Sequence, residues 1–288
     1  MPMAVKSMNI FPRMYRWLCK REENRKLIFC INSGRSGSHY LVTLLNTAKE
    51  IRAFHEPEPA MNGQYLQLIN QYEYKDTYGR RKIKCNAIRK TLREMEENKI
   101  YCETNHMFIK TFFDVVIDAF KNVGIIILRR ELVHVLKSFI ELNYFTNKNE
   151  AWKDWMSSPN AKTHAIDCID KDENLDQYDL CIAYLIDIEA RIQRFLGKYP
   201  HLPIYEVRLE QLNDIESVKK LFAELDITMT HETYKVIGEK VNTREKRKKE
   251  FDNHTSLEYC RERIIEYIEK ADLRGIKIPK SIAFDRLF

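Results

Sequence analysis

The sequence is poor in glycine and contains no long apolar run. Only eight of its 288 residues are glycine. No segment approaches the ~20 consecutive apolar residues of a membrane-spanning helix, and residues 1–25 hold no apolar stretch of the length that a signal peptide needs. We therefore expect no integral membrane segment. Residues 1–25 mix aromatic and basic side chains and are predicted to form an N-terminal helix or arm, in preference to a membrane-surface helix, beside a single domain over residues 26–288.

Cysteine patterns typical of disulfide or metal sites are also lacking. The seven cysteines are odd in number and form no CxxC pair, and several lie in apolar runs. This pattern predicts buried thiols in a reducing compartment, and hence a cytoplasmic protein. No His, Cys or Asp cluster has the spacing of metal ligands. The formal charge of +6 is spread along the chain, which suits an anionic ligand but does not indicate a nucleic-acid partner.

Two of the few glycines stand three residues apart in a loop over residues 32–39. The apolar run 27–31 before it is typical of a buried strand, and apolar residues recur at helical spacing over residues 40–48 after it. A loop between a strand and a helix N-terminus collects unpaired N–H groups and the positive end of the helix dipole. We expect a phosphate or sulfate site there, formed by Ser33, Gly34, Arg35, Ser36, Gly37, Ser38 and His39.

Strand-like and helical segments alternate along most of the chain. Short strands are predicted at residues 27–31, 51–54, 100–104, 125–128 and 204–208. Helices are predicted at residues 112–120, 132–139, 180–196 and 257–271, with further helical pattern over residues 61–99. Such alternation predicts an α/β fold with a central, mainly parallel sheet flanked by helices.

Polar residues stand at several predicted strand ends, where ligands bind in open α/β sheets. His55 and Glu56 follow the second strand and precede Pro57, while His106 follows the third strand. Arg129 and Arg130 close the fourth strand.

Two common phosphate loops do not match. The pattern GxxxxGK[ST] fails because His39 stands where its second glycine is required and no lysine follows, and GxGxxG is absent. What the loop resembles is the 5′-phosphosulfate loop of sulfotransferases that use 3′-phosphoadenosine 5′-phosphosulfate (PAPS), particularly the bacterial and carbohydrate-modifying members that carry arginine at the position of Arg35. A strand that ends in arginine with a serine eight residues later, here Arg130 and Ser138, resembles the second signature of that family. The RKGxxGxWK element of the cytosolic members and the usual proline after the strand arginine are missing.

The resemblance implies a P-loop-type nucleotide-binding fold and a PAPS-dependent sulfotransferase. It implies that Arg130, or its neighbour Arg129, binds the 3′-phosphate together with Ser138. It further implies that the basic segment containing Arg244 and Lys246 covers the nucleotide. The reaction would be an in-line displacement at sulfur without a metal, with adenosine 3′,5′-bisphosphate as the product. Arg35 would then stabilise charge on the bridging oxygen.

The attacking group must lose a proton, so a general base is expected. Glu56 is the first candidate for this role, with His55 and His106 as rivals. The acceptor, a small molecule or a glycan with a hydroxyl or amine, and the oligomeric state stay open. Two other functions also stay open: an ATP-dependent kinase-like phosphotransferase and a non-catalytic anion-binding module.

Overall fold

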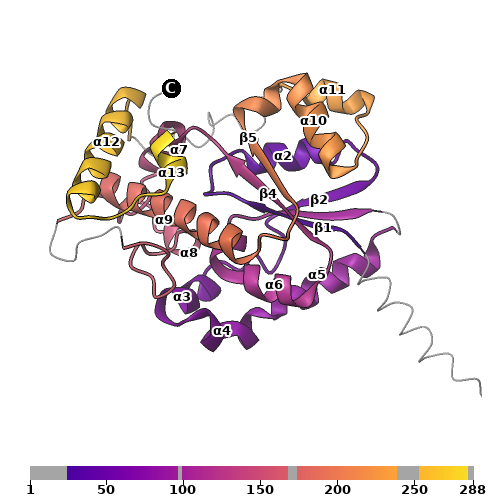
Figure 1. The fold of residues 1–288 in the computed structure, drawn as a ribbon, viewed down its shortest axis with the longest axis horizontal. Coiled ribbons are helices and arrows are strands. Elements are labelled where there is room, and N and C mark those ends of the chain that lie inside the picture. Colours follow the sequence, from indigo (N-terminus) through magenta and orange to yellow (C-terminus); the bar gives the residue numbers. More distant parts are fainter. Residues whose placement is uncertain (1–24, 97–98, 168–173, 239–252, 285–288) are drawn as a thin grey trace, which may run out of the picture.

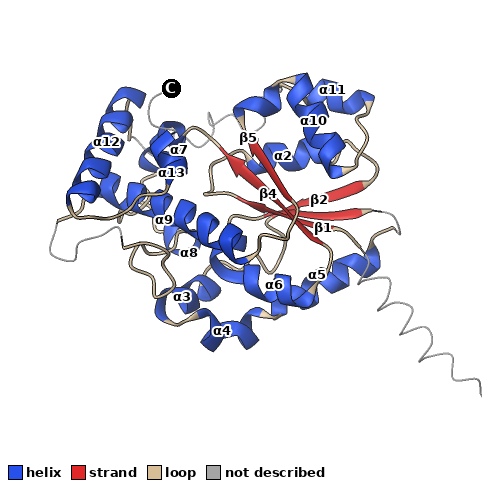
Figure 2. Cartoon of the chain, viewed as in Figure 1, coloured by secondary structure: helices blue, strands red, loops and turns tan. Residues whose placement is uncertain are grey.

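A single sheet of five parallel strands forms the centre of the described chain. The computed structural model describes residues 25–96, 99–167, 174–238 and 253–284. The strands are β1 (Leu27–Ile31), β2 (Ile51–His55), β3 (Ile100–Thr104), β4 (Val123–Arg129) and β5 (Ile204–Arg208). Their order across the sheet is β2-β3-β1-β4-β5, and every pair is parallel. Figure 2 shows the strands in red at the centre, with helices in blue around them. The predicted α/β fold with a parallel sheet is confirmed.

Helices cover both faces of this sheet (Figure 1). On one face lie α2 (Ser38–Leu45), α10 (Ile215–Leu225) and α11 (His231–Val236). The other face is covered by α5 (Ile83–Glu94), a π-helical turn η1 (Phe108–Phe112), α6 (Phe113–Ala119) and α9 (Gln177–Lys198). The remaining helices surround this second layer: α3 (Gln64–Gln71), α4 (Tyr74–Arg81), α7 (Leu132–Glu141), α8 (Trp152–Trp155), α12 (Leu257–Leu273) and α13 (Lys280–Phe284). A 3₁₀ turn, η2 (Glu210–Asn213), follows β5.

The central strand β1 shows why the sheet is buried on both sides. All five of its residues are buried. Side chains alternate along a strand, so Leu27, Phe29 and Ile31 join the core under α9 and η1. Ile28 and Cys30 join the core under α2 and α10. An apolar run of this kind is what a strand covered on both faces requires.

The predicted elements are found with shifted ends. The fourth strand was predicted for residues 125–128 and runs over 123–129, so Gly124 lies inside a strand, facing Tyr205. The helical pattern over residues 61–99 corresponds to the three helices α3, α4 and α5. The segment after α7 contains the short helix α8.

Some predictions fall on residues outside the described ranges. These are the N-terminal arm apart from Arg25, the cofactor-binding residues Arg244 and Lys246, and the cysteines Cys19 and Cys168. The other five cysteines are buried thiols without a disulfide. Among the described helices, none has both the length and the apolar character that a membrane crossing requires.

Candidate active site

The loop between β1 and α2 has a backbone that few residue types can adopt. Gly34, Arg35 and Gly37 all have positive φ angles of 82°, 57° and 86°. Gly37 is the N-cap of α2 and supplies no side chain to the first N–H groups of the helix. A Cβ atom at Gly37 would overlap the side chain of Leu209. Glycine is therefore favoured here both by conformation and by space, and a helix N-terminus without a capping side chain is suited to an anion.

Side chains from distant parts of the sequence meet at this loop. The Arg35 Nε atom donates a hydrogen bond to Ser138 Oγ on α7 at 3.1 Å. Arg130, just after β4, donates from Nη1 to the backbone carbonyl of Arg35 at 3.1 Å. Ser138 is fully buried. Arg130 and Ser138 follow the loop by about a hundred residues in the sequence. In the structure they meet the loop and form one cationic cluster with it.

The neighbouring Arg129 has other partners. It pairs with Glu189 of α9 at 3.2 Å and with Glu206 of β5 at 2.7 Å. Both carboxylates raise the pKa of Arg129 against the opposing effect of burial. For Arg130, in contrast, burial lowers the pKa, because the nearby carboxylates of Glu210 and Glu131 do not offset it. Of the two arginines, Arg130 is the one that touches the loop.

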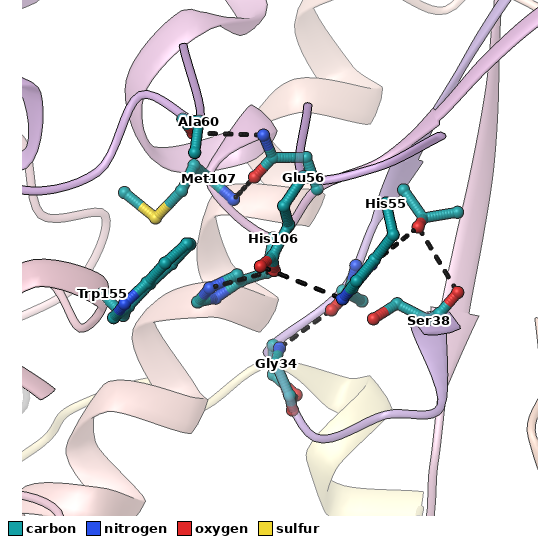
Figure 3. A network of polar contacts seen from close by, with 12 residues as sticks. Gly34, Ser38, His55, Glu56, Ala60, His106, Met107 and Trp155 are labelled. Carbon is teal, nitrogen blue, oxygen red and sulfur yellow. Dashed lines mark hydrogen bonds and ion pairs between the residues drawn. The ribbon is translucent and has the colours of Figure 1, made fainter. Parts of the chain in front are cut away.

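Glu56 lies at the end of β2, on the carboxyl edge of the sheet beside the loop. Its backbone is in the left-handed region, with φ 47°, and its N–H donates to the Thr104 carbonyl at 3.1 Å. A non-glycine residue held in that region costs about 1–3 kcal/mol and is frequent at functional sites. Its carboxylate faces two imidazoles: Oε1 lies 3.6 Å from His106 Nε2, and Oε2 lies 3.9 Å from His55 Nε2 (Figure 3).

Burial raises the pKa of Glu56 from 4.5 to about 7. The charge of Lys110 opposes this rise, Glu103 adds to it, and Arg35 opposes it. A carboxyl group with a pKa near 7 is half ionised at neutral pH, which suits a group that accepts a proton during a reaction.

His106 is buried and held on three sides. Its ring stacks on Trp155, with centroids 5.4 Å apart and planes 16° apart, and its Nδ1 atom lies 3.1 Å from the position of a Cβ at Gly34. Lys110 Nζ lies 3.0 Å from the same Nδ1 atom. Burial, followed by the charge of Lys110, holds the pKa of His106 well below its usual value. His106 is therefore a neutral imidazole at pH 7.

His55 occupies a more open position on the other side of Glu56. Its Nδ1 atom lies 3.2 Å from Thr104 Oγ1, and its ring meets that of His39 edge to face at 5.3 Å. Partial burial and the neighbouring His39 lower the pKa of His55. His39 itself is exposed on the first turn of α2.

A buried polar network holds the segment that carries Glu56. Lys84, on α5, pairs with Glu103 at 2.7 Å, and both side chains are almost fully buried. Lys84 also donates to the carbonyls of Pro57 and Pro59 at 2.9 and 3.0 Å. Asn105 donates to Glu103 at 2.9 Å and to the Ala60 carbonyl at 3.1 Å. The chain after β2 is thus fixed by Lys84 from α5 and by Asn105, which directly follows β3.

The structure places most of the predicted site residues at one edge of the sheet. These are residues Ser33 to His39 of the loop, His55, Glu56, His106, Arg130 and Ser138. Sequence reasoning missed Lys110, Lys84 and Tyr184. Lys110 stands four residues after His106, a spacing that places two side chains on one side of a helical turn. For Lys84 and Tyr184 no sequence signal indicates a role at the site.

Solved structures similar to the chain include three sulfotransferases. One, from Mycobacterium tuberculosis, is 11% identical, with a TM-score of 0.49, and the match covers 88% of this chain and 79% of that one. The sulfotransferase domain of the curacin biosynthetic pathway is 13% identical, with a TM-score of 0.47 and coverage of 88% and 92%. A sulfotransferase from Alicyclobacillus acidocaldarius is 12% identical, with a TM-score of 0.45 and coverage of 85% and 96%. No family model and no curated protein matches the chain.

Proposed function

We propose that the chain is a sulfotransferase that moves the sulfuryl group of PAPS to a hydroxyl or amine of a small molecule or glycan. The observation that carries the proposal is the meeting of Arg35, Ser138 and Arg130 beside the N-terminus of α2. PAPS carries anionic groups at the 3′ and 5′ positions of its ribose, so a site for it needs two cationic groups close together. This cluster supplies both, on a loop whose glycines admit a close approach of the ligand.

The residues at the loop fit such a donor in a defined way. The N–H groups at the start of α2 and the Arg35 guanidinium are suited to the 5′-phosphosulfate end. Arg130 and Ser138 are suited to the 3′-phosphate end, and the proposal assigns that end to Arg130 because Arg129 is paired with two carboxylates. When bound, the donor supplies an activated sulfuryl group. Arg35 would stabilise the charge that develops on the bridging oxygen.

Glu56 is the proposed general base. Its raised pKa is near the pH at which the reaction would run, and it lies at the same sheet edge as the loop. His106 is neutral and directs one ring nitrogen at Glu56 while Lys110 occupies the other. His55 is the alternative base because it is more open and also borders the carboxylate. A general base contributes about 10²–10⁴ in rate.

The proposal keeps the expectations that no nucleic acid takes part and that the protein is cytoplasmic. The second expectation is supported by the five buried, unpaired thiols, which suit a reducing compartment.

Incubation with ³⁵S-labelled PAPS and a panel of hydroxyl and amine acceptors tests the activity. The proposal predicts labelled acceptor and adenosine 3′,5′-bisphosphate in equal amounts. Glu56→Gln should lose most of the turnover and keep the affinity for the bisphosphate. Phosphate transfer from Mg·ATP would replace the proposal with the kinase-like alternative. Tight binding of nucleotide with no transfer to any acceptor would favour a non-catalytic module.

A further inference from the structure

Lys110 is a fully buried lysine whose contacts reach both halves of the candidate site. It lies on η1, the π-helical turn that follows β3. Its Nζ atom has three close partners: the Trp155 carbonyl at 2.6 Å, Tyr184 Oη at 3.0 Å and His106 Nδ1 at 3.0 Å. π-Helical turns are rare and are frequently found at functional sites.

The hydrogen positions in this cluster follow from what each partner can do. The Trp155 carbonyl can only accept a hydrogen bond. Tyr184 Oη directs its own hydrogen to the Ser33 carbonyl at 3.0 Å, so it accepts from Lys110. An ammonium group has three hydrogens and no lone pair. Burial, followed by the charge of Arg191, holds the pKa of Lys110 well below its usual value, while Glu56 and Asp187 oppose this. A neutral Lys110 amine would accept a hydrogen bond from Nδ1–H. The inference takes the ammonium form, whose third hydrogen points at His106 Nδ1 and makes that atom the unprotonated nitrogen of the ring.

We infer that Lys110 is a positioning residue that fixes the tautomer of His106, so that the Nε2–H group of the imidazole faces Glu56. The inference rests on the proposed function, in which Glu56 is the base. The Nε2 atom lies 3.6 Å from Glu56 Oε1 (Figure 3). A hydrogen on Nε2 stabilises the carboxylate and holds its orientation, whereas a lone pair at that position would repel it.

The same lysine connects the base to the anion-binding loop. Tyr184 accepts from Lys110 and donates to the carbonyl of Ser33, the first residue of the glycine-containing segment. His106 in turn packs against Gly34. Lys110, His106 and Tyr184 thus fix the position of Glu56 relative to the loop. A transfer between a donor bound at the loop and an acceptor beside Glu56 requires such a fixed geometry.

Several other groups act on the protonation of His106. The charged or titratable side chains that influence it are Lys110 from η1, His55 and Glu56 from the end of β2, and Arg35 from the loop. Lys110 is the one that touches its Nδ1 atom. Loss of the Lys110 charge and donor should therefore make protonation of Nδ1 easier, which gives an imidazolium that pairs with Glu56.

Side-chain ¹⁵N NMR of histidine-labelled protein tests the inference without substrate or nucleotide. The signals of His106, one of eight histidines, are assigned by their absence in His106→Gln. In the wild-type protein we expect an unprotonated Nδ1 and a protonated Nε2 near neutral pH. A protonated Nδ1 in the wild-type protein overturns the inference, and this measurement does not depend on whether any Lys110 variant folds.

The variant Lys110→Met adds a second readout. We expect the pKa of His106 to rise by about one pH unit or more, and the single tautomer to be lost. The matched control is Lys26→Met, since Lys26 donates to the Leu225 carbonyl at 2.9 Å near the opposite edge of the sheet. This control should leave the His106 signals unchanged. If Lys110→Met lowers the melting temperature but leaves the tautomer and pKa of His106 as they were, Lys110 is structural only and the inference is wrong.

These results are separable from the test of the proposed function. Absence of PAPS or bisphosphate binding would remove the sulfotransferase proposal and leave the His106 spectra as measured. The reverse result, binding together with a protonated Nδ1, would remove the role of Lys110 alone.

Discussion

Replacement of Glu56 by glutamine should stabilise the protein, and the gain should grow with pH. Burial raises the pKa of this carboxyl from 4.5 to about 7, so the folded state binds its proton more tightly than the unfolded state does. The free energy of unfolding therefore falls as the pH rises from about 4.5 to about 7. Glutamine has a similar shape and does not ionise, so the variant does not undergo this loss.

The size of the effect follows from the difference of about 2.5 between the two pKa values. At 1.36 kcal/mol for each pKa unit, this difference corresponds to about 3 kcal/mol at pH 8, an upper figure because the side chain is 23% exposed. Near pH 4.5, where the carboxyl is protonated in the folded state and half protonated in the unfolded state, the two proteins should differ by less than about 1 kcal/mol. At pH 8 this gain should raise the melting temperature of the variant by roughly 5–10 °C.

Urea denaturation of both proteins at several pH values between about 4.5 and 8 measures this difference. Glu58→Gln is the matched control, since Glu58 lies two residues further along the same loop and is exposed. A difference between wild type and Glu56→Gln that does not change with pH would refute the reasoning. So would a variant that is less stable than wild type at pH 8, because Glu56 would then be stabilised as a carboxylate by its cationic neighbours.

Three further outcomes are expected. Gly37→Ala should lower the free energy of unfolding by about 1–3 kcal/mol, because φ is 86° and the new methyl group overlaps Leu209; a urea midpoint equal to wild type would contradict this. Lys84→Met should cost about 3–5 kcal/mol by leaving the buried Glu103 without its cation, and Lys84→Met/Glu103→Leu should recover part of that loss; a single variant as stable as wild type would show that the pair contributes little. If Glu56 is the base, sulfuryl transfer should rise with pH through about 7 as its carboxyl ionises; a rate that falls over this range, or a Glu56→Gln variant with full turnover, would exclude it.

The centre of the sheet could be predicted from the sequence because its inner strands are buried on both faces. Runs such as residues 27–31 and 125–128 are apolar throughout, and this signal is strong over short lengths. The start of β4 could not be predicted, because Gly124 interrupts the apolar run of that strand. In the fold, Gly124 lies within the strand and packs beside Tyr205. The loop over residues 33–39 was visible because two glycines and a strand–helix junction coincide there.

The support of the site could not be predicted in the same way. Lys84 lies in a polar helical segment and Lys110 in a largely apolar one, and lysine side chains in either setting are usually solvated. Their burial depends on carbonyls and a carboxylate that only the folded chain brings to them. The pairing of Arg129, on which the proposal for Arg130 draws, also depends on the fold, because Arg129 continues the face of β4 that α9 covers and there meets Glu189.

Calorimetric titration with adenosine 3′,5′-bisphosphate tests the central claim most directly. We expect one site per chain in the wild-type protein. Arg130→Ala should weaken binding by about 10–100-fold through loss of a charge-assisted hydrogen bond, whereas Arg129→Ala should stay within about threefold of wild type. A stronger effect at Arg129 than at Arg130 would move the phosphate contact by one residue. No binding to the wild-type protein at millimolar bisphosphate would contradict the assignment of the loop, Arg130 and Ser138 to a PAPS site.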